Sequence, residues 1–110
     1  LLGLGEFIMA DTLGSLVDKL FTVDTKMWNN QEEIYKIRRM TFEEYKVKYF
    51  SDEQGAIRLW NCLKKACDLN VQRNDLIDCI DEKIIEIIKD AIDGKELDAG
   101  KHIQRKHKSY

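Results

Sequence analysis

The chain has 110 residues, of which 35% are charged and 44% are hydrophobic, and it contains no proline. This length suits one domain, and this composition is typical of a mostly helical soluble protein. The net charge of -2 excludes a strongly basic nucleic-acid-binding surface, and no apolar run approaches the ~20 residues of a membrane span. We therefore expect no membrane partner, no specific nucleic-acid partner and no cofactor.

Residues 1–10 precede the first helix signal. They are apolar but lack the basic start and the small-residue cleavage site of a signal peptide. We predict a flexible leader here, within which Met9 is a candidate natural start. Asp11 or Thr12 then caps a first helix, which we expect to reach about Arg39.

The first helix carries a regular apolar stripe. A single heptad frame places apolar residues at its a and d positions, with Asn30 as a polar exception at a d position. The apolar members are Leu13, Leu16, Leu20, Val23, Met27, Ile34 and Ile37. Val17, Phe21 and Trp28 widen the stripe, so we expect this helix to contact more than one neighbour.

Two helix-start signals follow, ten residues apart. Thr41 with Glu44, and Ser51 with Gln54, each have the spacing of a capping box. They predict a short connecting helix and then a long one. Gly55 would fall in the first turn of the long helix, where we expect it to do little harm.

The long helix is predicted over residues 56–92, which contain no glycine, and Gly94 is a suitable residue to end it. Its apolar a and d positions are Ala56, Leu59, Leu63, Ala66, Ile77, Ile80, Ile84, Ile87 and Ala91. Since the connection is short, the two long helices should run antiparallel, as a helical hairpin domain over residues 11–94. Residues 95–110 hold both histidines and an excess of basic residues. They predict a flexible tail, capable at most of weak contact with a nucleic-acid backbone.

The second half of the long helix is apolar over more than half of its circumference, which one neighbouring helix cannot cover. Exposed apolar surface of that size calls for another partner. A second copy of the hairpin is the simplest one, so the predicted fold is all-α, a four-helix bundle formed as a homodimer.

A polar layer interrupts the predicted seam at mid-height. Asn70 falls at an a position and Arg73 at a d position, with Asn74 beside them. In an antiparallel hairpin, Asp18 and Asp24 of the first helix lie near this level, and Asp18 is the expected partner of Arg73 because a buried charge requires one. Two interpretations stay open. The layer fixes the helix register, or it forms a pocket in which the guanidinium binds a phosphorylated or carboxylated ligand.

Acidic residues offer an alternative site. Asp75 and Asp78 have the spacing of helical magnesium ligands, and Glu32 and Glu33 would have to supply the facing pair. The heptad frame points Asp75 and Asp78 outward, so a solvated acidic face is the favoured explanation of these residues. We thus expect a non-enzymatic oligomeric module for binding or assembly, and the alternative is a magnesium-dependent nucleotide or phosphate-ester hydrolase.

The three cysteines, Cys62, Cys67 and Cys79, all lie on the long helix and form no C-x-x-C motif. An odd number of cysteines without that motif is typical of reduced thiols, which predicts a cytoplasmic location.

Two stretches carry a resemblance. Residues 13–20 (LGSLVDKL) with Lys26 and Trp28, and residues 69–81 (LNVQRNDLIDCID), resemble a family of short helical proteins of unknown function. Members occur in bacteria, some near polysaccharide-synthesis genes, and similar proteins occur in tailed phages. The resemblance implies an all-helical fold and no particular activity. The positions that it marks are Asp18, Lys19, Asn70, Arg73 and Asn74.

Overall fold

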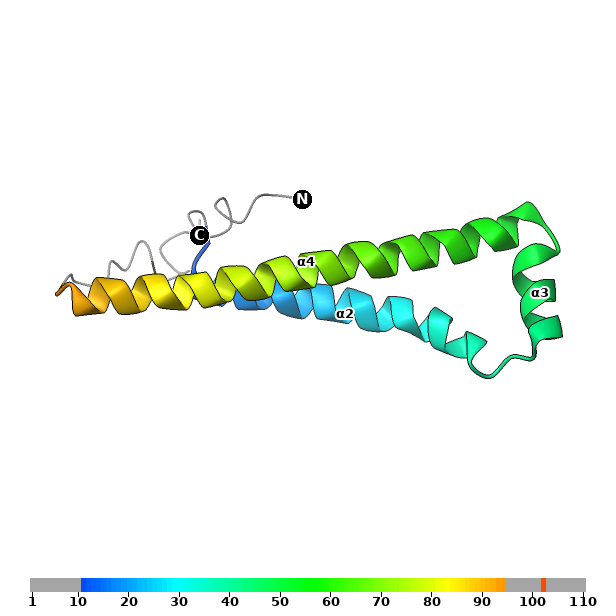
Figure 1. The fold of residues 1–110 in the computed structure, drawn as a ribbon, viewed down its shortest axis with the longest axis horizontal. Helices are drawn as coiled ribbons and strands as arrows, with labels where there is room; N and C mark the ends of the chain where they lie inside the picture. Colours follow the sequence, from blue (N-terminus) through cyan, green and yellow to red (C-terminus); the bar gives the residue numbers. More distant parts are fainter. Residues whose placement is uncertain (1–10, 95–101, 103–110) are drawn as a thin grey trace, which may run out of the picture. The chain divides into compact units, whose positions relative to one another are not determined.

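A computed structural model describes residues 11–94 and His102. They form three helices, α2 (Leu13–Ile37), α3 (Phe42–Phe50) and α4 (Glu53–Ile92), and the described residues contain no strand (Figure 1). The predicted all-α class is therefore confirmed. Figure 1 shows α4 as one continuous helix.

The helix starts follow local capping chemistry. The Oγ1 atom of Thr12 accepts a hydrogen bond from the backbone N–H of Ser15 at 3.2 Å, so Thr12 is the cap of α2. Thr41 caps α3 as predicted, because its hydroxyl oxygen accepts from the N–H of Glu44 at 3.2 Å. Each bond satisfies one of the amide groups that a helix start leaves without a partner.

The predicted box that opens α4 is wrong by one residue. Asp52 is the cap, since its Oδ1 accepts from the N–H of Gly55 at 2.8 Å. The hydroxyl of Ser51 instead donates to the carbonyl of Val47 at 2.6 Å and closes the end of α3. At the other end of α4, Gly94 has φ +71°, as expected of a residue that ends a helix in the left-handed conformation.

The chain divides into two compact units. The central unit is Val23–Val71, and the terminal unit is formed by the described residues up to Thr22 and from Gln72 onward. Side chains buried in the central unit are those of Val23, Tyr49, Leu59 and Leu69. In the terminal unit, the buried side chains are those of Thr12, Leu16, Leu76, Cys79 and Lys83.

The predicted stripe of α2 is confirmed, because all of its heptad positions from Leu13 to Ile37 are buried or half-buried. The three residues expected to widen it are exposed instead. The exposed fractions are 49% for Val17, 72% for Phe21 and 64% for Trp28.

The predicted stripe of α4 is partly wrong. Leu63 and Ile84 are 48% and 41% exposed, and the buried residues include Leu69, Cys79 and Lys83. Leu59, Cys62, Ala66, Leu69, Leu76, Cys79 and Lys83 are buried or half-buried and follow one side of α4, and we call these seven residues the inner face. Four other positions of the predicted stripe, Ala56, Ile77, Ile80 and Ile87, are half-buried as well. Because α4 has apolar residues on more than one side, the number of apolar residues in a heptad frame does not identify which side is buried.

Gly55 has a different role from the one expected. It is buried, and a Cβ atom added there would lie 2.5 Å from the carbonyl oxygen of Lys48 and 3.0 Å from the Cα of Tyr49. Glycine therefore lets the first turn of α4 pack directly against the backbone of α3.

Candidate functional site

The residues of the predicted polar layer do not form a buried layer. Asp18, Asp24, Asn70 and Asn74 are exposed, and Arg73 is half-buried. The described contact of Asp18 is made by its backbone carbonyl, which accepts from Thr22 Oγ1 at 3.1 Å. The expected pairing of Asp18 with Arg73 is not observed, while Asp24 and Arg73 each have an interaction partner. Leu69 takes the inward position that the prediction gave to Asn70, because the inner face is displaced by one residue here.

The alternative metal site is not assembled in the described part of the chain. Asp78 and Glu32 are exposed, whereas Asp75 and Glu33 are half-buried. No group of three or more His, Cys, Asp or Glu side chains that could hold a metal ion is found among residues 11–94 and His102.

Glu33 is the centre of an ionic cluster in the central unit. Its Oε1 accepts from the hydroxyl of Tyr49 at 3.0 Å and lies 3.2 Å from Lys48 Nζ. Its Oε2 lies 3.3 Å from Lys36 Nζ. These contacts join α2 to α3 and leave the carboxylate committed to protein partners.

The cluster shifts the ionisation of its members. Hydrogen bonds from Lys48 and then Tyr49 lower the pKa of Glu33 below its ordinary value. Burial, followed by the neighbouring carboxylate, raises the pKa of the Tyr49 hydroxyl. Glu33 is thus held charged and Tyr49 neutral, which is the state that their hydrogen bond requires.

A second polar contact joins α2 to α4 in the central unit. Asn30 Nδ2 donates to the carbonyl of Cys62 at 3.0 Å, and Cys62 Sγ lies 3.4 Å from Asn30 Oδ1. Burial raises the pKa of the Cys62 thiol, so this sulfur stays protonated and is a poor nucleophile. The signal for this contact was present in the sequence, since Asn30 is the polar exception in the heptad frame of α2.

A pocket of about 390 Å³ lies beside this contact. It is lined by Asn29, Asn30, Glu33, Arg58, Asn61, Cys62 and Lys65. Two of the lining side chains, Asn30 and Glu33, are half-buried. Their hydrogen bonds, to the Cys62 carbonyl and from the Tyr49 hydroxyl, join α2 to its neighbouring helices.

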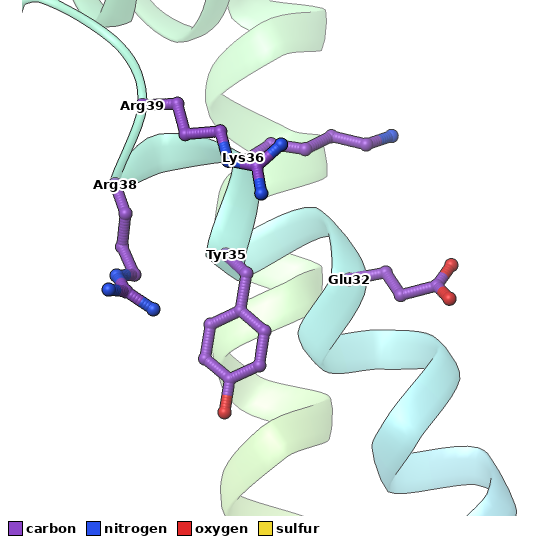
Figure 2. A pocket seen from close by; sticks show the side chains of 5 residues that line it. All are labelled: Glu32, Tyr35, Lys36, Arg38 and Arg39. Atoms are coloured by element: carbon purple, nitrogen blue, oxygen red, sulfur yellow. The ribbon is translucent and has the colours of Figure 1, made fainter.

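A pocket of about 450 Å³ lies at the end of α2, lined by Glu32, Tyr35, Lys36, Arg38 and Arg39 (Figure 2). Figure 2 shows the side chain of Arg38 beside the Tyr35 ring, and its guanidinium carbon is 6.0 Å from the ring centroid. All five residues are exposed, so a ligand here would stay largely hydrated. The three cations favour an anion, but water screens their attraction.

Charged side chains also cluster in the terminal unit. Lys83 is buried and its Nζ lies 3.0 Å from Glu86 Oε2, and His102 Nε2 lies 3.4 Å from Asp90 Oδ2. The predicted leader (1–10) and the rest of the predicted tail (95–110) lie outside the described residues. His102 itself is half-buried and in contact with α4.

Several apolar side chains of α4 are exposed and have no described role in the fold. In the terminal unit, Ile85 and Ile88 are 51% and 50% exposed, and Ile92 is 77% exposed. In the central unit, Trp60 is 60% exposed and Val71 is 47% exposed. Soluble proteins commonly expose single apolar side chains, but larger groups of them mark interaction sites, so the isoleucines of the terminal unit are candidates for an interface.

No described helix is long and apolar enough to cross a membrane. Comparisons with protein-family models, curated proteins and solved structures gave no match to this chain. The resemblance to short bacterial and phage helical proteins therefore stays a prediction.

Proposed function

We propose that this protein is a non-enzymatic assembly module that forms a homodimer, in which two antiparallel helical hairpins make a four-helix arrangement. The observation that carries the proposal is the exposed isoleucine surface on the second half of α4, formed by Ile84, Ile85, Ile88 and Ile92. The contacts of α2 with α3 and α4 in the central unit support the hairpin part of the proposal.

The polar chemistry of the described residues favours a structural role over catalysis. Glu33 is held by Lys48 and Tyr49, and the thiol of Cys62 is kept protonated and bonded to Asn30. A nucleophile or general base needs a free, activated atom within reach of a substrate. These groups instead use their polar atoms to connect helices.

The magnitude of the hydrophobic gain indicates how large the interface must be. Full burial of an isoleucine side chain stabilises by roughly 1.5–3 kcal/mol, so a half-exposed one contributes about 1 kcal/mol when covered. Four isoleucines from each of two copies then contribute about 8 kcal/mol, against an association cost of roughly 4–15 kcal/mol. Burial of the isoleucines alone therefore about balances the association cost, and a stable dimer must bury more of the α4 surface.

Sedimentation equilibrium of the wild type and of two variants tests the proposal. Ile88→Asp removes a half-exposed apolar side chain from the surface and should shift the protein to monomer at tens of micromolar. Val47→Asp is the matched control, since Val47 is 68% exposed on α3, outside the proposed interface, and should leave the dimer intact. Equal effects of the two substitutions, or a monomeric wild type, would refute the proposal.

A further inference from the structure

α4 carries a second heptad stripe, distinct from its inner face. In order along the helix it consists of Ile57, Trp60, Lys64, Cys67, Val71, Asn74, Asp78, Asp81, Ile85, Ile88 and Ile92. Every one of these residues is exposed in the structure. The positions are spaced alternately three and four residues apart, as the a and d positions of a coiled coil are. Seven of the eleven are apolar, and the four polar ones are Lys64, Asn74, Asp78 and Asp81. We call this stripe the outer face.

The outer face lies on the opposite side of α4 from the inner face. Positions of the inner face such as Leu59 and Cys62 follow positions of the outer face by two residues, which is a rotation of about 200°. The two stripes can therefore serve different neighbours. The inner face packs within the chain. The outer face has the spacing of a surface that packs against another helix, and no described helix packs against it.

The order of residues along the outer face indicates what kind of helix would pack against it. Apolar residues occupy both ends of the stripe, with Lys64 in the first half and Asp81 in the second half. When a second copy of the helix runs in the opposite direction, the Lys64 half of one copy lies beside the Asp81 half of the other, and the apolar ends lie beside each other. Resting on the proposed homodimer, we propose that the two α4 helices pair antiparallel through their outer faces, as the central pair of the four-helix arrangement.

The register follows from the antiparallel rule that an a position of one helix opposes a d position of the other. In the best register, Ile57 packs on Ile88 of the second copy, and Trp60 packs on Ile85 of the second copy. Lys64 then lies opposite Asp81 of the second copy. Each of these layers occurs twice because the pair has two-fold symmetry.

Charge selects this register over its neighbours. Lys64 Nζ lies 5.1 Å from the Trp60 ring centroid, which places the cation at the outer face, and no ion pair of Asp81 is found among the described residues. Sliding the helices by one heptad would set Asp81 against Ile57 or Val71 of the second copy. Burying an unpaired carboxylate against an apolar side chain is costly, so Asp81 favours the register in which it meets Lys64. The Asp78 carboxylate, which this register sets opposite Cys67 of the second copy, opposes it, but the neighbouring registers leave Asp81 unpaired and set Asp78 against Trp60 or Asn74 of the second copy.

The flanking positions agree with the same register. Leu63 and Ile84, both exposed in the single chain, lie opposite each other at one edge of the pair. The pairing thus explains why these two apolar residues are left out of the inner face. One like-charged contact, Asp68 with Asp75 of the second copy, falls at the other edge, where salt screens it.

Charge reversal tests the register. Lys64→Asp and Asp81→Lys should each raise the dimer dissociation constant tenfold or more, and the double reversal should restore it. Both positions are exposed, so circular dichroism should show an unchanged helix content. Single variants that dimerise like the wild type would overturn the register but leave the homodimer standing, whereas a monomeric wild type would overturn both proposals.

A cross-link provides an independent measurement. Asp78→Cys places a thiol opposite the native Cys67 of the second copy, so copper-phenanthroline oxidation should give a disulfide-linked dimer, with the 67–78 linkage identified by mass spectrometry. The two positions are about 16 Å apart along one helix, so they cannot bridge within a chain. Lys89→Cys is the control, and its thiol should not link to Cys67. Failure of the first linkage in a dimeric protein would overturn the register.

Discussion

Substitution of Gly55 tests how closely α3 and α4 pack. Gly55→Ala adds a Cβ that would lie 2.5 Å from the Lys48 carbonyl oxygen and 3.0 Å from both the Cα and the carbonyl oxygen of Tyr49. All three atoms are backbone atoms of α3, which cannot rotate away as a side chain can. Overpacking of this kind costs roughly 1–3 kcal/mol, while alanine gains up to about 1 kcal/mol in helix propensity. We expect a net loss of about 1–2 kcal/mol.

Gly14→Ala is the matched control, because Gly14 also lies in the first turn of a helix and nothing lies within 4 Å of its added Cβ. This substitution should stabilise the protein by about 0.5 kcal/mol. Urea denaturation at one fixed protein concentration measures both variants, because the stability of the proposed homodimer would depend on concentration. If Gly55→Ala were as stable as Gly14→Ala, the close contact between α3 and α4 would be refuted.

Three further predictions concern the polar contacts of the central unit. Tyr49→Phe removes the hydrogen bond to Glu33 and should lower the free energy of unfolding by about 1 kcal/mol, because the half-exposed carboxylate regains water; an unchanged urea midpoint would contradict this. The lowered pKa of Glu33 adds stability that is fully present above its ordinary value of 4.5 and is lost as the pH falls through the folded pKa. Glu33→Gln should therefore flatten the acid limb of stability against pH, and an identical limb would refute the pairing. Asn30→Ala removes the bond to Cys62 and should cost about 1–2 kcal/mol, whereas Asn29→Ala, at an exposed neighbour, should stay within about 0.5 kcal/mol in the same denaturation assay.

Local signals predicted the parts of the fold that depend on local chemistry. The cap at Thr41, the end of α4 at Gly94 and the stripe of α2 follow from short-range hydrogen bonds and from a frame with one clear apolar side. Residues close in sequence decide these features, so the sequence is sufficient to find them.

The contacts between helices were less predictable. Glu33 meets Tyr49 only because α3 turns back on α2, and the clash at Gly55 involves the backbone of another helix. The inner face of α4 was misplaced because Leu63 and Leu69 are equally apolar, and only packing decides which of them is buried. The polar contact of the central unit accordingly forms at Asn30 and not at Asn70.

The molar mass of the wild-type protein over a dilution series tests the central claim most directly. Light scattering coupled to gel filtration should give twice the mass of one chain at tens of micromolar, with dissociation on dilution. A single species of one chain mass across the whole series would contradict the claim that the exposed apolar surface of α4 pairs with a second copy.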